Sequence, residues 1–337
     1  MQLTPTAKKN NIIYLIDILK KHSDEEHPLL INDIIEIMQK EYLMEIDRKT
    51  VSRNLENLID MNDSNYSIER TGRGVYIQPV FENSELRLII DSILSSKNIP
   101  HSQCNMLINK LKGLSNKYFD AKIKHIFPLT SDTPENKELF FTIDVLNDAI
   151  AKSRQVQFRY NSFDVDKKLH PRKNKDGEIS EYIINPYQIV TTNGRYYLIC
   201  NYDHYDTVAN YRIDRITNIK LLDTPSRPKS QVKGLEHGLD LPKHMAEHIY
   251  MFSGDSIRVT FRAKRTSLNE IIDWFGTNVD FRDIDDEYIT AAVNVNEQAM
   301  LYWSMQYGQF VQILEPQSLI DKIKNILNDM QKKYSSL

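Results

Sequence analysis

The spacing of apolar residues changes along this chain, and the change limits the possible folds more than any other feature. Within residues 7–80, three segments place apolar residues at helical intervals, and the stretch 66–78 then alternates apolar and polar residues around Gly72 and Gly74. The apolar positions are Ile12, Ile13, Leu15, Ile16 and Leu19, then Ile31, Ile34, Ile35 and Met38, and last Val51, Leu55 and Leu58. This order of helices and hairpin is typical of a winged helix-turn-helix, which we predict for residues 1–80.

Residues 81–138 continue with helical spacing and form a predicted connector. Leu86 and Ile93 mark one apolar stripe, and Met106 and Leu111 mark another. The polar stretch 129–138 contains Pro134 among clustered Ser, Asp and Thr residues. Such a composition predicts a loop, and we place a domain boundary there.

The central part of the chain is rich in strand patterns. After a short helix at 139–153, strands are predicted at 155–160, 181–190, 195–202, 207–213 and 216–222. The Asn193-Gly194 pair suits a tight hairpin because both positions tolerate positive φ. Short strands at this density predict a small β-barrel over residues 139–223.

The last part of the chain predicts a second sheet. Residues 224–254 contain three prolines and several glycines and are predicted to be a linker with one short helix. Residues 255–337 follow a βαββαβ order with an added final helix, which packs as a split βαβ sandwich. The predicted fold class is therefore α+β and multidomain.

Composition indicates an ordinary folded protein. The chain is 41% hydrophobic and 26% charged, with a net charge of −3. Asp17, Lys20 and Lys21 interrupt the apolar residues near the N-terminus, and no run of about 18 apolar residues occurs, so we expect neither a secretory signal nor a membrane span. Cys104 and Cys200 lack disulfide or zinc spacing, which fits a reducing, cytoplasmic location.

The predicted third helix carries the sharpest chemical signal. If Val51, Leu55 and Leu58 face the core, polar and basic residues lie on the other side and at the helix start. Together with two hairpin arginines, they are the candidate contacts to double-stranded DNA: Arg48, Lys49, Thr50, Ser52, Arg53, Asn54, Arg70 and Arg73. The alternative is a solvated helix face. Residues 1–80 hold 10 Lys and Arg against 13 Asp and Glu, so long-range attraction to DNA would be weak without a second copy.

Other motifs point away from enzyme chemistry. The Gly72-Arg73-Gly74 stretch is not followed by Lys and Ser or Thr, so it is interpreted as a hairpin turn rather than a phosphate loop. His244 and His248 have the spacing of two metal ligands on one helix face, but no third ligand is apparent. No nucleophile motif occurs. We therefore expect no catalytic residues, cofactor or metal.

Arginines and tyrosines recur along the predicted barrel strands. Because side chains alternate across a strand, Arg195 and Tyr197 share one face, and Tyr196 lies on the other. Arg212 and Arg215 offer guanidinium groups that suit phosphate or nucleotide ligands. The alternative for these two arginines is ion pairing with Asp203, Asp206 or Asp214.

The segment around Tyr196-Tyr197-Leu198, between the Asn-Pro turn at 185–186 and the sequence YRIDRI, resembles the WYL domain. Tyr196 stands where that family usually has tryptophan, and Tyr182 where many members have arginine. The resemblance implies an Sm-like barrel that senses single-stranded DNA, RNA or a nucleotide, with a C-terminal extension for dimerisation or regulation. By carry-over, the pocket residues are Tyr160, His170, Tyr187, Arg195, Tyr197, Arg212 and Arg215.

Pattern and resemblance together predict a homodimeric transcription regulator acting in phage defence or the DNA-damage response. Its operator affinity would change when the WYL domain binds its effector. The alternative is a nucleic-acid-binding accessory protein that modulates a phage-defence effector and has no promoter of its own.

Overall fold

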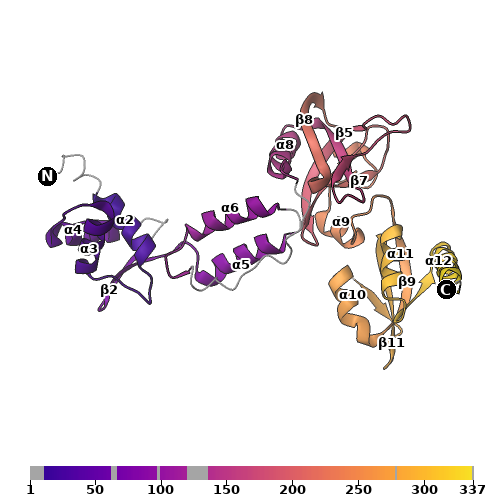
Figure 1. The fold of residues 1–337 in the computed structure, drawn as a ribbon. Coiled ribbons are helices and arrows are strands. Elements are labelled where there is room, and N and C mark those ends of the chain that lie inside the picture. The colour runs from indigo at the N-terminus through magenta and orange to yellow at the C-terminus, as the bar shows by residue number, and fades with distance from the viewer. Residues whose placement is uncertain (1–10, 62–66, 97–98, 120–135, 278, 336–337) are drawn as a thin grey trace. The chain divides into compact units, whose positions relative to one another are not determined.

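The computed structural model describes residues 11–61, 67–96, 99–119, 136–277 and 279–335, and the chain divides into two compact units, Met1–Glu135 and Asn136–Leu337 (Figure 1). The predicted loop at 129–138 lies mostly outside the described residues. No helix in the described ranges is long and apolar enough to cross a membrane.

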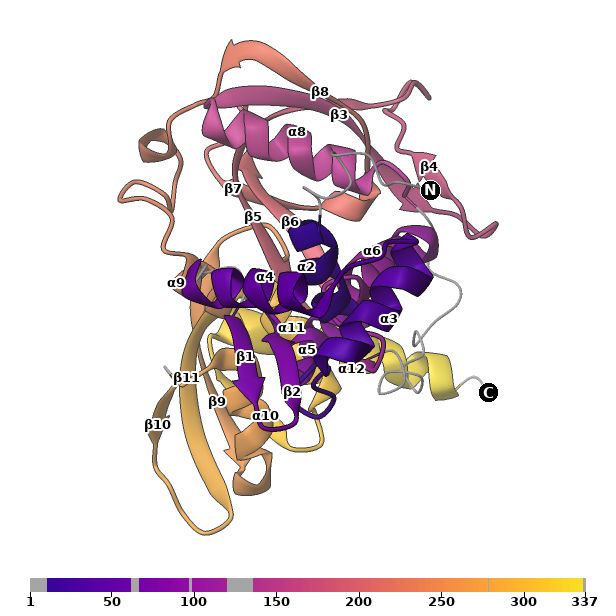
Figure 2. The same cartoon turned by 90° about the vertical axis from the view of Figure 1, so that its left-hand side faces the viewer.

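The first unit begins with helices and a hairpin in the predicted order (Figure 2). The elements are α2 (Asn11–His22), α3 (Ile31–Tyr42), α4 (Arg48–Met61), β1 (Ser67–Thr71) and β2 (Gly74–Gln78). Leu15, Ile34 and Leu55 from the helices and Ile68 and Val75 from the hairpin belong to one buried cluster. Burial of this shared apolar surface holds helices and hairpin together as one domain.

Asp47 fixes the start of α4. Its Oδ1 accepts a hydrogen bond from the backbone N–H of Thr50 at 2.9 Å, and its Oδ2 accepts one from the Thr50 hydroxyl at 2.7 Å. A carboxylate at this place satisfies an N–H that has no partner within the helix. Asp47 thus caps the start of α4.

The hairpin is also joined to the loop before α3. Leu29 and Val75 exchange two backbone hydrogen bonds of 2.8 Å. Gly74, next to Val75, has φ of +143°, and a Cβ there would lie 2.5 Å from the carbonyl oxygen of Leu29. Only glycine fits this approach of two backbones.

The connector contains two neighbouring helices, α5 (Asn83–Ser95) and α6 (His101–Lys112) (Figure 1). Leu86 and Ile90 of α5 pack with Phe119, which follows α6. The connector thus has a small apolar cluster of its own.

In the second unit, a helix packs on a sheet that does not close into a barrel. The elements are α8 (Leu139–Ala151), β3 (Arg154–Phe163), β4 (Leu169–Pro171), β5 (Glu181–Thr192), β6 (Arg195–Asn201), β7 (Val208–Arg212), the 3₁₀ turn η1 (Ile213–Arg215) and β8 (Ile216–Pro225). The predicted strands are present, with β4 in addition, but among the described residues β7 pairs only with β6 and β8 only with β3. η1 joins β7 to β8, and these two strands form no ladder with each other, so among the described residues the sheet of the predicted small β-barrel is not closed.

Residues 224–254 are not a free linker. They contain η2 (Lys229–Gln231) and α9 (Leu241–Glu247). Val232 and Leu235 are buried against Tyr187 of β5, and Met251 is buried against the same sheet. The prolines and glycines shape a packed segment whose apolar residues cover the sheet.

The C-terminal elements have the predicted βαββαβ order with a final helix. They are β9 (Ser256–Lys264), η3 (Arg265–Ser267), α10 (Leu268–Phe275), β10 (Asp280–Arg282), β11 (Tyr288–Asn296), α11 (Glu297–Gln306), β12 (Val311–Glu315) and α12 (Gln317–Ser335). The strand order β10-β11-β9-β12 places β11 between β9 and β10, which is the split βαβ arrangement. Phe261, Phe275 and Trp303 lie in its core.

Candidate nucleic-acid interface and effector site

The exposed face of α4 carries cations that form no ion pair with an acidic residue in the described part of the chain. Val51, Leu55 and Leu58 are buried, so Arg48, Lys49 and Arg53 are exposed on the remaining surface, as are Arg70 and Arg73 of the hairpin. Of these five, none forms an ion pair with another residue that the structure describes. Unpaired guanidinium and ammonium groups are suited to bind phosphate oxygens or base edges.

A hollow of about 360 Å³ separates α4 from the hairpin. Arg48, Ser52 and Glu56 line it from α4, and Arg70 lines it from β1. Leu30 and Asn32, at the start of α3, close another side. Cations from both elements therefore border one concave surface.

Two predicted DNA contacts on α4, Asn54 and Thr50, are less exposed than expected. The side chain of Asn54 is only 7% exposed, because residue 54 falls three after Val51 and four before Leu58, on the side that faces the core. The Thr50 hydroxyl is half-buried and donates to Asp47. Ser52 is half-buried and borders the hollow.

In the second unit, Arg212 is held in an ion pair. Its Nε and Nη2 donate to Oδ1 and Oδ2 of Asp214 at 3.0 and 2.5 Å, and the two side chains are 17% and 13% exposed. Burial alone would lower the pKa of Arg212, but the hydrogen bonds that it donates to the Asp214 carboxylate, and the charge of that carboxylate, outweigh burial and raise the pKa. The ion-pair alternative is thus realised for this arginine.

Also in the second unit, Tyr160 lies at the centre of a group of three arginines, Arg172, Arg212 and Arg215. Its hydroxyl accepts the backbone N–H of Arg212 at 3.3 Å, and burial raises its pKa. The guanidinium of Arg172 lies 4.8 Å from the Tyr160 ring centroid, and that of Arg215 lies 5.8 Å from the Phe163 ring centroid. Cations stacked on aromatic rings in this way leave their N–H groups able to bind a phosphate.

Sequence reasoning did not select Arg172. It follows a three-residue strand whose pairing with β3 brings it to Tyr160, and only that register reveals the contact. Its Nε also donates to the Ser162 hydroxyl at 2.9 Å.

Arg195 and Tyr197 share a face with Arg212, since Tyr197 lies opposite Arg212 in the β6–β7 ladder. The Nε atoms of Arg195 and Arg215 are buried and have no hydrogen-bond partner among the described residues. A buried donor without a partner is costly. These two groups therefore favour a bound acceptor.

The polar partners of His170 and Tyr187 are residues outside this group. The exposed His170 pairs through Nε2 with Asp166 at 2.9 Å. Tyr187 is buried, its hydroxyl donates to the Arg227 carbonyl at 2.8 Å, and burial raises its pKa to about 12. Tyr187 thus supports the packing of residues 224–254.

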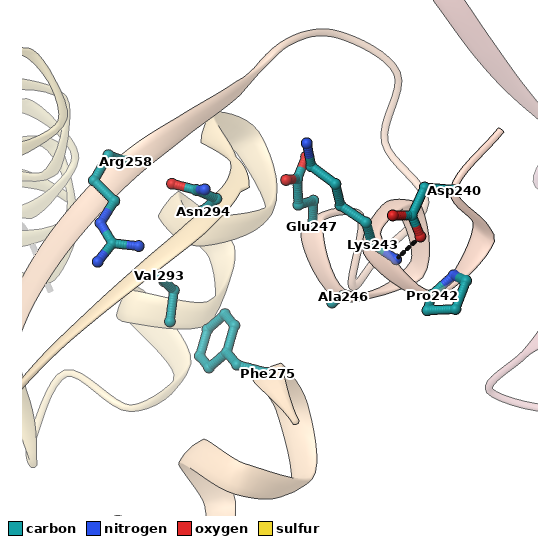
Figure 3. Close-up of a pocket in the computed structure, with 9 residues that line it drawn as sticks. All are labelled: Asp240, Pro242, Lys243, Ala246, Glu247, Arg258, Phe275, Val293 and Asn294. Atoms are coloured by element: carbon teal, nitrogen blue, oxygen red, sulfur yellow. Dashed lines mark hydrogen bonds between the residues drawn. The ribbon is translucent and has the colours of Figure 1, made fainter. Parts of the chain in front are cut away.

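A separate hollow of about 280 Å³ lies beside α9 (Figure 3). Asp240, Lys243 and Glu247 line it from α9 and its start, facing Arg258 of β9 and Asn294 of β11. Because two acids balance two bases, this hollow has no preference for an anion.

Comparison with known proteins identifies the central domain. Residues 142–221 match the family model of the WYL domain. The match begins within α8 and ends within β8, so it contains Tyr160, Arg172, Arg212 and Arg215.

Solved structures that match this chain include two whose comparisons cover nearly all of it. Proteasome accessory factor B/C (PafBC) of Arthrobacter aurescens is 17% identical with a TM-score of 0.30; the comparison covers 97% of this chain and 49% of that one, so this chain spans about half its length. A CRISPR Cas-related protein is 14% identical with a TM-score of 0.39, over 100% of this chain and 88% of that one. No curated protein matched the chain.

Proposed function

We propose that this chain is a sequence-specific DNA-binding transcription regulator. Residues 11–78 act as a winged helix-turn-helix, with α4 as recognition helix and the β1–β2 hairpin as wing. The WYL domain binds a nucleic-acid or nucleotide effector that changes operator affinity. The observation that carries the proposal is the set of unpaired cations on α4 and the wing: Arg48, Lys49, Arg53, Arg70 and Arg73.

Charge makes dimerisation part of the proposed mechanism. Residues 1–80 contain 10 basic and 13 acidic residues, so one copy of this domain attracts DNA weakly from a distance. Two copies on one duplex add their contacts through effective concentration. We therefore propose a homodimer on a partly palindromic operator in the cytoplasm.

The decisive experiment removes two cations from α4. Duplexes are first selected from a random pool by the full-length parent, and the Arg48→Ala/Arg53→Ala variant is then measured against them. We expect at least tenfold weaker binding, about 1.4 kcal/mol, with unchanged folding.

The control is Lys40→Ala/Arg87→Ala, which removes two exposed charges from the same unit outside α4 and the wing. It should bind within about twofold of the parent. Equal affinity of the α4 variant and the parent for the selected duplexes would contradict DNA recognition by α4.

A further inference from the structure

A buried asparagine after α6 joins the connector to the loop between α2 and α3. Asn116 is 9% exposed. Its Nδ2 donates to the Ser23 carbonyl at 3.1 Å and to Oδ2 of Asp24 at 3.0 Å. Its Oδ1 accepts the backbone N–H groups of Tyr118 at 3.0 Å and Phe119 at 3.3 Å. This arrangement requires a group that donates on one side and accepts on the other, which a primary amide provides.

Ring and carboxylate contacts reinforce this junction. The rings of His27 and Tyr118 stack at 3.7 Å, and the His27 imidazole Nδ1 lies 2.7 Å from Oδ1 of Asp24. Burial opposes ionisation of Asp24, yet hydrogen bonds from His27 and Asn116 lower its pKa. Asp24 is thus held as an ionised acceptor between the loop and the connector.

The same loop holds the wing. The Ser23 hydroxyl donates to the Leu19 carbonyl at 2.7 Å and accepts the N–H of Ile77, in β2, at 3.2 Å. Further along the loop, Leu29 pairs with Val75 of β2. On the other side of the junction, Phe119 is buried against α5. Asn116 is therefore linked to the wing through a single residue, Ser23, which bonds Asn116 through its carbonyl and Ile77 through its hydroxyl.

We propose that Asn116 is a positioning residue that couples the connector to the wing. Movement of the connector is passed through Asn116 to Ser23 and from there to β2, which sets the position of Arg70 and Arg73. The contacts stand on their own, whereas the consequence for DNA rests on the proposed function.

The first test needs no DNA. In full-length Asn116→Asp, the new carboxylate loses the two donors and faces Asp24 and the Ser23 carbonyl. We expect backbone hydrogen exchange at Ile77 and Val75 to become at least tenfold faster, with α4 unchanged. Asn109→Asp is the matched control, since Asn109 is exposed on α6 of the same connector. Equal exchange of the wing in both variants would overturn the proposal.

Tyr118→Leu provides a milder change. It keeps Asn116 and removes the stacking on His27, so we expect a smaller increase in exchange at the same two amides. If the Asp variant does not fold, this variant decides between coupling and no coupling by the same readout.

The second test concerns function. Asn116→Asp should lower the magnitude of the negative slope of log affinity against log salt by roughly 2, as Arg70→Ala/Arg73→Ala does, because each lost phosphate contact removes about 0.9 from it. Combining all three substitutions should lower it no further. Additive slopes would refute coupling to the wing, whereas failure of the parent to bind duplex DNA would refute the proposed function and leave the exchange result standing.

Discussion

At the scale of single residues, the most perturbed imidazole of the second unit is that of His244. Its ring stacks on His248 at 4.2 Å, and both rings are buried. His248 Nδ1 lies 2.9 Å from the Phe252 carbonyl oxygen and donates to it, while Nε2 of His244 has no partner among the described residues. Burial, helped by the neighbouring His248, lowers the pKa of His244 from 6.5 to about 4.

This lowered pKa predicts acid sensitivity of the second unit. Above pH 6.5 the imidazole is neutral in both states, so its contribution to stability is complete; as the pH falls toward 4, the unfolded chain binds a proton that the folded one does not. The loss reaches on the order of 3 kcal/mol at the acid end. It is measurable by urea unfolding at pH 7.5 and 5, followed by the fluorescence of Trp274 and Trp303.

His244→Phe keeps an aromatic ring and should show a smaller drop in the unfolding midpoint between the two pH values. His237→Gln, at an exposed position of the same segment, should behave as the parent does. If the His244 and His237 variants show the same pH dependence, burial of His244 does not cause the loss of stability at acid pH.

The exposure or burial of single residues could be predicted from the sequence where it depends only on which face of one helix they occupy. The intervals of Val51, Leu55 and Leu58 correctly placed the exposed cations of α4. The same intervals, drawn around the helix, also place Asn54 beside the core, but its polar side chain led to the opposite expectation. Arg172 and the Arg212–Asp214 pair depend on strand register and a 3₁₀ turn, which a sequence pattern does not specify.

At the scale of elements, Gly74 controls how the wing joins the helices. Gly74→Ala would place a Cβ against the Leu29 backbone at a φ that side chains rarely adopt. We expect a loss of roughly 2 kcal/mol or more in the stability of the first unit. Gly72→Ala is the control, since a Cβ there meets nothing within 4 Å.

Thermal unfolding and hydrogen exchange of both glycine variants test this difference. Exchange at Val75, whose N–H donates to Leu29, should accelerate only in Gly74→Ala. Equal stability of the two variants would show that the wing tolerates separation from the loop.

The helices and strands could largely be predicted from the spacing of apolar residues, but the way in which they pair and pack could not. The alternation in residues 155–222 predicted the main strands of the central sheet, but not that β7 and β8 would form no ladder with each other. The prolines and glycines of 224–254 resemble a linker, but Val232, Leu235 and Met251 bury themselves on the sheet. Such packing depends on distant partners that local composition does not report.

At the scale of the whole molecule, the effector and the operator should be linked. We expect a short single-stranded oligodeoxynucleotide to bind the full chain and change its affinity for the selected duplexes. Arg215→Ala should weaken oligonucleotide binding about tenfold, because a phosphate of the oligonucleotide would lose the hydrogen bond that the buried Nε of Arg215 is free to donate. Arg159→Ala, on the same sheet and paired with Glu181, is the control.

Fluorescence titration of the oligonucleotide measures the first effect, and duplex binding with and without it measures the second. Unchanged affinity in Arg215→Ala would place the effector elsewhere. An oligonucleotide that binds without altering duplex affinity would separate the two activities.

The unpaired cations of α4 and the wing also have a kinetic consequence. They sit in a domain whose remaining residues are acidic in balance, within a chain of net charge −3. In the proposed regulator, a duplex that meets the remaining, net acidic surface of this domain is repelled, while one that meets the cations is attracted. On this proposal, the scarcity of positive charge selects the orientation of each encounter, so that fewer collisions succeed and those that do begin with α4 facing the duplex.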